Sequence, residues 1–275
     1  MNLDLVDQRG LVLLGCGKMG SAMLAGWLNA GTSARAISIL DPKPTEWVLS
    51  LQESGVSVNA GLPQNPAICI LAVKPQMMRE ALAALKPLGD GDTLFLSIAA
   101  GTPIRALETA LGARTPIIRA MPNTPAAVGH GITALIGNDQ TSNSDLKLAE
   151  NLLGAIGQTV RLDSEAQIDA VTAVSGSGPA YVFHLIETLA AAGEAQGLPA
   201  DIAMKLALTT VAGAGDLAEN AAETPAELRV NVTSPGGTTA AALGVLMDRA
   251  TGFPALLERA VTAAAARARE LGKQA

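Results

Sequence analysis

Three glycines near the start of the chain have the spacing of a loop that binds the pyrophosphate of a dinucleotide. In L-V-L-L-G-C-G-K-M-G, Gly15, Gly17 and Gly20 directly follow an apolar run and precede a helical pattern. In such loops the first glycine allows a tight turn, the second lets the backbone approach the pyrophosphate, and the third lets the helix pack on the sheet. The N–H groups at the helix start bind the phosphates. We therefore expect dinucleotide binding here, with Lys18 and Met19 among the contacts.

An acidic residue at the end of the second predicted strand bears on the choice of cofactor. Asp41 stands about 20 residues after Gly20, where an acid favours the free 2′-hydroxyl of NADH. Lys43 follows closely and could instead hold the 2′-phosphate of NADPH. In a third interpretation Asp41 only opens the D-P-K-P turn. The sequence leaves NADH and NADPH both open.

Two further strand ends are expected in the cofactor crevice, because ligands bind at the carboxyl ends of parallel strands. Val73, Lys74 and Pro75 follow one apolar run, and Ala99 and Ala100 follow the next. A solvated surface lysine is the alternative for Lys74.

The segment M-P-N-T-P follows a later strand in the same way. Its two prolines predict a rigid loop with Asn123 and Thr124 pointing outward. An ordinary stiff turn is the alternative.

A charge-free segment between Arg229 and Asp248 contains T-S-P-G-G-T-T at 233–239, which leads into an alanine-rich helix. Glycines let a ligand approach the backbone, and the helix start presents unpaired N–H groups and a positive dipole end. Such a loop can hold a small carboxylate without a basic side chain; an N-cap with a glycine-rich turn is the alternative. A second candidate loop, S-G-S-G-P-A-Y, lies at 175–181. The hydroxyls of the first loop belong to Thr233, Ser234, Thr238 and Thr239.

Short apolar runs alternate with helical patterns over roughly the first 160 residues, which predicts a parallel sheet covered on both faces. From about Asp163 only helical patterns remain. We therefore expect a Rossmann-type α/β dinucleotide-binding domain over 1–163 and an all-α domain over 164–275. The predicted strands are 11–14, 36–40, 56–58, 67–73, 93–98, 117–120, 132–136 and 158–162. The predicted helices of this part are 21–30, 46–54, 76–85, one from 103, and 144–155.

The helix predicted at 181–192 is apolar on nearly every side, with His184, Glu187 and Thr188 as its only polar stripe. A helix of this kind is buried on most sides. A domain of about 110 residues has little interior for several such helices, so we expect a second subunit to cover part of this surface. His184 is interpreted as a core or interface histidine, and neither it nor His130 belongs to a metal-ligand pattern.

The composition limits the class of protein. The chain has 275 residues, 49% of them hydrophobic and 2% aromatic, which allows a sizeable core of Ala, Val, Leu and Ile. A net charge of −6 without a cluster of Lys and Arg argues against binding nucleic acid through phosphates. No apolar run is long enough to cross a membrane. Because Cys16 and Cys69 match no metal spacing and the N-terminus is acidic, we expect a reduced, cytoplasmic protein without metal.

Several segments together resemble the pyrroline-5-carboxylate reductases, which carry out the last step of proline biosynthesis. They are G-C-G-K-M-G, A-V-K-P-Q, the A-A-G and M-P-N-T-P loops, D-A-V-T-A-V-S-G-S-G-P-A-Y and N-V-T-S-P-G-G-T-T, in the family's order over nearly the whole chain. The last two are the specific ones. The resemblance implies NAD(P)H-dependent reduction of L-1-pyrroline-5-carboxylate to L-proline. It also implies a helical domain that dimerises by intertwining helices, often into larger rings.

The resemblance assigns roles by position. Thr239 matches the threonine whose hydroxyl meets the ring nitrogen of the substrate, and Glu165 matches an acidic position near the substrate. Some relatives carry a small apolar residue at the position of Thr238, so a backbone role is implied there. The carboxylate-binding loop corresponds to Ser234, Gly237 and Thr238, and the further cofactor contacts correspond to Asn59 and Asn231.

Two other classes of protein share parts of this sequence pattern. A β-hydroxyacid dehydrogenase shares the G-x-G-x-M-G start but needs a general base, usually a helix lysine in its second domain. After residue 163 the only lysines are Lys205 and Lys273, and neither lies in a matching motif. A non-catalytic NAD(P)H-sensing module would keep the glycine loop but has no need for S-P-G-G-T-T. 

Overall fold

The computed structural model describes residues 4–274 and divides into two compact units. The first unit contains the chain up to Gly176 and returns from Ala264 onward, and the second contains 177–263. The domain limit expected at residue 163 stays a prediction, whereas the contacts themselves divide the chain after Gly176.

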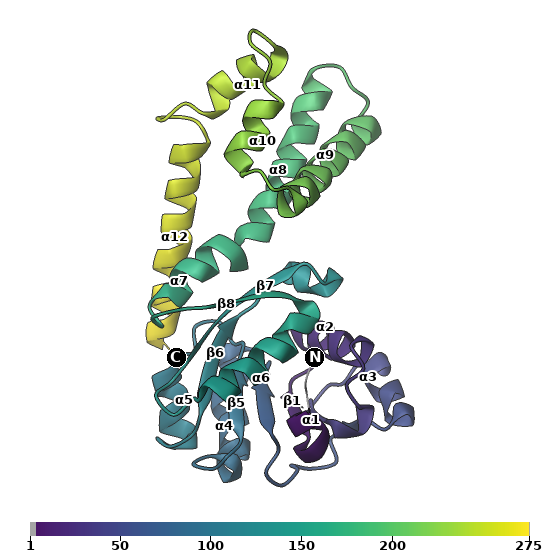
Figure 1. The fold of residues 1–275 in the computed structure, drawn as a ribbon, viewed down its shortest axis with the longest axis vertical. Coiled ribbons are helices and arrows are strands. Elements are labelled where there is room, and N and C mark those ends of the chain that lie inside the picture. The colour runs from purple at the N-terminus through teal and green to yellow at the C-terminus, as the bar shows by residue number, and fades with distance from the viewer. Residues whose placement is uncertain (1–3, 275) are drawn as a thin grey trace. The chain divides into compact units, whose positions relative to one another are not determined.

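The first unit is built on an eight-stranded sheet in the order β3-β2-β1-β4-β5-β6-β7-β8 (Figure 1). The strands from β3 to β6 are parallel, and the strand order reverses on either side of β1. Ligands of open α/β sheets bind at such a reversal, outside the carboxyl ends of the strands. The strands are β1 (Leu11–Leu14), β2 (Ile37–Leu40), β3 (Ser57–Val58), β4 (Ile68–Leu71), β5 (Leu94–Ser97), β6 (Ile117–Met121), β7 (Gly131–Gly137) and β8 (Gly157–Arg161).

The expectation of a wholly parallel sheet is wrong at one edge, because β7 runs antiparallel to β6. Parallel neighbours need a long crossover, usually a helix. Here only the short 3-10 turn Thr124–Val128 lies between the two strands, so the chain turns back on itself. β8 then pairs parallel to β7, after a helical crossover.

Helices cover both faces of the sheet, as the alternating pattern predicts. α2 and α6 contribute to the core cluster on one face, and α4 and α5 to the cluster on the other. The helix of the glycine loop begins at Lys18 rather than at the predicted residue 21, and a short N-terminal helix was not predicted. The helices are α1 (Asp4–Arg9), α2 (Lys18–Asn29), α3 (Glu46–Ser50), α4 (Met78–Leu85), α5 (Ile104–Leu111), α6 (Asn143–Leu153) and α7 (Gln167–Val171).

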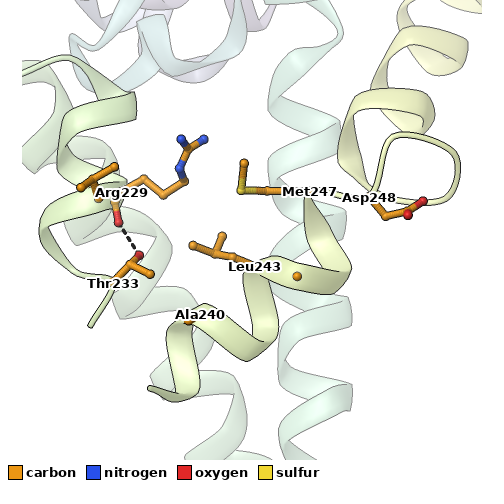
Figure 2. A pocket seen from close by; sticks show the side chains of 8 residues that line it. Arg229, Thr233, Ala240, Leu243, Met247 and Asp248 are labelled. Atoms are coloured by element: carbon orange, nitrogen blue, oxygen red, sulfur yellow. Dashed lines mark hydrogen bonds between the residues drawn. The ribbon is translucent and has the colours of Figure 1, made fainter. Parts of the chain in front are cut away.

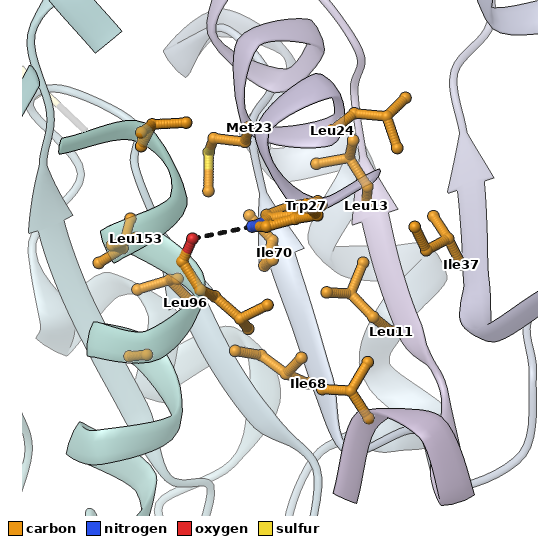
Figure 3. Packing of buried hydrophobic residues seen from close by; sticks show 14 of the residues in the cluster. Leu11, Leu13, Met23, Leu24, Trp27, Ile37, Ile68, Ile70, Leu96 and Leu153 are labelled. Carbon is orange, nitrogen blue, oxygen red and sulfur yellow. Dashed lines mark hydrogen bonds between the residues drawn. The ribbon is translucent and has the colours of Figure 1, made fainter. Parts of the chain in front are cut away.

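Trp27 of α2 lies at the centre of the larger cluster and packs against the central strands (Figure 3). Its indole N–H donates to the carbonyl oxygen of Leu152 at 2.9 Å, which joins α2 to α6. Successive strand residues face opposite sides of a sheet. Leu11 and Leu13 accordingly lie in this cluster, whereas Val12 lies in the other.

The second unit is all helix, as predicted for this part of the chain. Its internal core is small and consists of Ala190, Ala203 and Ala207, with Ile186 packed against it. Large apolar side chains on α8 are instead exposed, and Phe183 retains 60% of its accessible surface. Large exposed apolar surfaces of this kind are sites of association. The helices that reach into this unit are α8 (Gly178–Ala195), α9 (Ala200–Asn220), α10 (Pro225–Asn231), α11 (Thr238–Leu246) and α12 (Phe253–Gln274).

Candidate active site

The glycine loop directly follows β1, and two of its three glycines are required by the fold itself. Gly15 has φ +85°, a left-handed conformation that favours glycine. A Cβ there would lie 2.8 Å from Val73 Cγ1 and 2.9 Å from the carbonyl oxygen of Ala72. A Cβ on Gly20 would lie 2.6 Å from the carbonyl oxygen of Gly15. These two glycines therefore allow α2 to pack closely on the sheet, as expected.

Gly17 is different, because nothing within the chain explains its small size. It is the N-cap of α2 with φ −72°, and a Cβ there would meet no atom within 4 Å. It provides no side-chain cap for the helix. The first turn of α2, which begins with Lys18 and Met19, therefore follows an uncrowded glycine and has no side-chain cap. A dinucleotide pyrophosphate is the kind of group that such a helix start binds.

Asp41 follows β2, and its carboxylate is held by two backbone donors. Oδ2 accepts the N–H of Cys16 at 2.6 Å, and Oδ1 accepts the N–H of Lys43 at 2.7 Å. The negative charge is thereby fixed against the glycine loop. A carboxylate that accepts two such bonds retains lone pairs for a hydroxyl group, but its charge repels a phosphate.

Asn59 follows β3 and braces the main chain of Asp41. Its Oδ1 accepts the N–H of Asp41 at 3.0 Å, and its Nδ2 donates to the carbonyl oxygen of Asp41 at 2.8 Å. Asn59 adopts φ +54°, a conformation that asparagine tolerates better than most residues. Both functions of its amide are thus used to fix the residue that we expect to meet the ribose.

The other predicted cofactor residues follow β4, which lies beside β1, and β5, which lies beside β4. Val73 is half-buried close to Gly15, whereas Lys74 and Pro75 are exposed. Ala99 is buried and Ala100 is exposed at the end of β5. The topology therefore brings the ends of β1, β4 and β5 together at one edge, as predicted. The Lys74 side chain forms no ion pair within the described residues. A lysine that contacts the cofactor and a solvated surface lysine would both leave it so.

The M-P-N-T-P loop differs from its prediction. Thr124 is exposed as expected, but Asn123 is only 9% exposed. Its Oδ1 accepts the N–H of Ile132 at 2.9 Å and so closes the turn between β6 and β7. Asn123 therefore stabilises the loop from inside and does not point outward.

The predicted carboxylate loop ends at the start of α11, as the sequence indicates. Gly236 has φ +69°, and Gly237 is the N-cap of α11 without any side-chain cap. The Thr233 hydroxyl donates to the carbonyl oxygen of Arg229 at 2.6 Å, so it is used within the chain. Asn231 is the exposed last residue of α10. Within residues 4–274, the hydroxyls of Ser234, Thr238 and Thr239 have no hydrogen-bond partner.

The second candidate loop, at 175–181, is largely helical. A π-helical turn at Thr172–Gly176 continues α7, and α8 begins at Gly178. The Ser175 hydroxyl donates to the carbonyl oxygen of Val171 at 3.2 Å, one turn back. Small residues here form a tight helical connection that leads into the N-terminus of α8, as expected, and their contact with a ligand stays a prediction.

A cavity of about 450 Å³ lies between α10 and α11, with the Arg229 side chain extending into it (Figure 2). Its lining is mostly apolar and includes Leu243 and Met247. Thr233, the first residue of the predicted carboxylate loop, lines it, whereas Ser234, Gly237, Thr238 and Thr239 do not. The cavity therefore lies beside one end of that loop, within the helical unit.

Glu165 precedes α7, and one of its carboxylate oxygens has two donors. Oε1 accepts Nη1 of Arg119 at 2.7 Å and the N–H of Ile104 at 2.9 Å. Arg119 lies on β6 and is 6% exposed. Sequence reasoning missed Arg119, although a charged residue within the apolar strand I-I-R-A-M was a signal for it.

The remaining reactive side chains form no second catalytic centre among the described residues. Burial raises the pKa of the Cys16 and Cys69 thiols, so both stay protonated at neutral pH. His184 is exposed on α8 with Nδ1 3.1 Å from Oε2 of Glu187. No group of His, Cys, Asp and Glu in residues 4–274 could hold a metal ion. No helix in this part of the chain is long and apolar enough to cross a membrane.

Comparison with known proteins gives consistent matches over the whole chain. Residues 165–271 match the model described as pyrroline-5-carboxylate reductase dimerisation, and residues 11–101 match the model described as NADP oxidoreductase coenzyme F420-dependent. A pyrroline-5-carboxylate reductase of Pseudomonas aeruginosa is 42% identical over 96% of this chain and 97% of its own length. One from Pisum sativum is 38% identical over 97% of both chains.

Solved structures agree with these matches. A pyrroline-5-carboxylate reductase from Coxiella burnetii has a TM-score of 0.89 and 34% identity, covering 96% of this chain and 98% of the other. Pyrroline carboxylate reductase from Plasmodium falciparum, solved with NADP bound, has a TM-score of 0.81 and 29% identity, covering 97% and 99%. The expected fold class and the expected self-association through the helical part are confirmed.

The glycine loop yields a prediction that separates binding from folding. Gly17→Ala adds a methyl group where the fold has room, so the melting temperature should stay within about 2 °C of the wild type. The same methyl group stands before the start of α2, so the Kd for NADH and NADPH should rise by about tenfold or more, a loss of about 1.4 kcal/mol. Fluorescence titration of the cofactor and thermal unfolding measure the two effects.

Gly15→Ala is the matched comparison, because its Cβ clashes with Ala72 and Val73 and should lower the melting temperature as well. Unchanged cofactor binding by the Gly17→Ala protein would show that this loop does not hold the pyrophosphate.

Proposed function

The chain belongs to the pyrroline-5-carboxylate reductase family, and we infer from this that it reduces L-1-pyrroline-5-carboxylate to L-proline with NADH or NADPH. The observation that carries the inference is the identity of 42% over nearly the full length of both chains. The open helix start at Gly237 supports it, because the substrate is a small carboxylate.

The first unit has a cradle that fits a dinucleotide. Gly17 leaves the start of α2 open, and the N–H groups that begin with Lys18 and Met19 hold the pyrophosphate. Gly15 and Gly20 fix that helix on the sheet. When bound, the cofactor supplies the hydride that reduces the imine carbon. The flanking contacts of this unit come from Val73, Lys74, Pro75, Ala99 and Ala100.

The second unit holds the substrate by neutral donors. The N–H groups at the start of α11, after Gly237 and Thr238, bind the carboxylate together with the Ser234 hydroxyl. The Thr239 hydroxyl, which has no partner among residues 4–274, orients the ring nitrogen. A basic side chain at this place would repel the cationic imine, since like charges at short range are costly.

No general acid or base is required of the protein. A protonated cyclic imine already carries its proton and an electrophilic carbon. The chain has only to hold the two reactants in contact and in the correct orientation, which is a large part of many rate enhancements. The Thr239 hydroxyl thus accepts the N–H of the protonated imine and orients it, and it is not the source of a proton.

The preferred cofactor in this proposal is NADH. Two backbone N–H groups, of Cys16 and Lys43, fix the Asp41 carboxylate against the glycine loop. From there it can accept a ribose hydroxyl and repel a 2′-phosphate. The exposed Lys43 side chain offers the competing attraction.

The place of action in this proposal is the cytoplasm. The buried, protonated thiols of Cys16 and Cys69 are compatible with a reducing compartment. Detection of the protein in the membrane fraction of cells or outside them would contradict this.

The activity and the cofactor preference are tested in one assay. Adding pyrroline-5-carboxylate should cause oxidation of the reduced cofactor, read as loss of absorbance, whereas 3-hydroxy acids with the oxidised cofactor should give no reduction. The kcat/KM should be higher with NADH than with NADPH. In the Asp41→Ser protein the ratio of NADPH to NADH efficiency should rise by about tenfold or more, about 1.4 kcal/mol.

Turnover of 3-hydroxy acids would favour the dehydrogenase alternative, and cofactor binding without any turnover would favour the sensing module. A higher kcat/KM with NADPH in the wild type would contradict the role given to Asp41.

Thr239→Ala tests the orienting hydroxyl. The kcat should fall by about 10- to 100-fold, because a misplaced reactant costs that much, whereas the Kd of the cofactor should be unchanged. Thr239→Ser keeps the hydroxyl and should retain most of the activity. Thr109→Ala on α5 is a control, since its exposed hydroxyl only donates to the carbonyl oxygen of Arg105. Wild-type kinetics in the Thr239→Ala protein would remove Thr239 from the site.

A further inference from the structure

Arg119 is a buried cation with one counter-ion. It lies on β6, beside Ser97 of β5 and Ile136 of β7, and only 8% of its side chain is exposed. Within the described residues the one hydrogen bond of its side chain goes to Oε1 of Glu165, at 2.7 Å. A charge at this depth is tolerated only when it is paired, and removing one partner is costly. The position of Glu165 is therefore fixed by the sheet.

The same oxygen of Glu165 also fixes the start of α5. It accepts the N–H of Ile104, the first residue of that helix, at 2.9 Å. The N-cap of α5 is Pro103, which offers no side-chain cap. A carboxylate at a helix start is favourable both as an acceptor and for the helix dipole. Glu165 thus caps a helix that lies 61 residues earlier in the sequence.

The segment that Glu165 holds in this way is the 99–102 loop, of which the proposed function assigns Ala99 and Ala100 to the cofactor. Its own hydrogen bonds are few: the N–H of Ala99 approaches the Ser97 hydroxyl at 3.4 Å. Residues 100 and 101 form a turn, and the Thr102 hydroxyl is buried without a hydrogen-bond partner among the described residues. A Cβ on Gly101 would lie 3.5 Å from Leu271 Cβ of α12, so the loop also packs against that helix. The N–H of Ile104 is the point at which Glu165 anchors the far end of the loop.

We propose that Glu165 and Arg119 are a positioning pair that sets the 99–102 loop against the cofactor, and that Glu165 acts through Ile104 and not by contact with the substrate. The inference rests on the proposed function in one respect, namely that this loop contacts the cofactor. It gives Glu165 a role different from the one implied by family resemblance. It also adds Arg119 to the residues on which hydride transfer depends.

The two roles of Glu165 predict different kinetics. If the pair positions the loop, Glu165→Gln and Arg119→Met should each lower kcat and raise the cofactor Kd. For each variant, the fall in kcat multiplied by the rise in Kd should amount to about tenfold or more. The KM for pyrroline-5-carboxylate should stay within about threefold, and the double variant should be no worse than the poorer single variant, because both disrupt one unit. The isotope effect with deuterated NADH should increase as hydride transfer becomes slower.

If Glu165 contacted the substrate, Glu165→Gln would raise the KM for pyrroline-5-carboxylate, Arg119→Met would not, and the two effects would add. That result overturns the proposal, as do folded variants with wild-type kcat, cofactor Kd and isotope effect. All proteins are assayed well below their melting temperatures. The double variant removes both charges and therefore leaves no unpaired charge buried in the sheet. It can be assayed in place of a single variant that does not fold.

Arg114→Met is the matched control, because Arg114 and Asp90 form an exposed pair 3.9 Å apart whose loss should leave every parameter unchanged. The cofactor Kd is measured without substrate. A wild type that binds NADH but does not turn over pyrroline-5-carboxylate would therefore contradict the proposed function, while the change in Kd would still report on the pair.

Discussion

The close approach of the chain at Gly15 is the constraint on which the rest of the site depends. At Gly15 the left-handed backbone leads the chain from β1 toward α2 in close contact with Ala72 and Val73. The carbonyl oxygen of Gly15 in turn leaves room only for a glycine at position 20. This packing points the start of α2 at the carboxyl edge of the sheet. The Asp41 carboxylate accepts the N–H of Cys16 in the same turn, so the group that we expect to meet the ribose also stabilises the loop that we propose to bind the pyrophosphate.

Both anionic parts of the reaction are assigned to helix starts and not to basic side chains. α2 and α11 each begin after a glycine N-cap that provides no side-chain cap, Gly17 in one case and Gly237 in the other. Unpaired N–H groups bind anions there. A cationic imine gains from this arrangement, since the neutral hydroxyl of Thr239 can accept its N–H and does not oppose its charge. The match to a dimerisation model indicates self-association through the helical part of the chain. We expect this association to cover the exposed apolar helices near the loop that precedes α11.

Local patterns predicted most of the fold, because buried parallel strands are continuous apolar runs and glycine spacing has direct steric causes. Three features had no such local signal. The direction of β7 depends on the length of its connection and not on its own residues. Small residues around Ser175 fit an open loop and a π-helical turn equally well. The pairing of Arg119 with Glu165 joins residues 46 positions apart, which only the folded chain brings together.

In the proposed mechanism the protein orients its reactants and supplies no acid or base. The pH dependence of kcat/KM for pyrroline-5-carboxylate is the direct test, since that profile reports ionisations of the free enzyme and the free substrate. Between about pH 5 and 9, where unperturbed carboxylates and lysines do not titrate, we expect a single ionisation that matches the imine of the free substrate. A second ionisation that belongs to the enzyme and is required for turnover would contradict it.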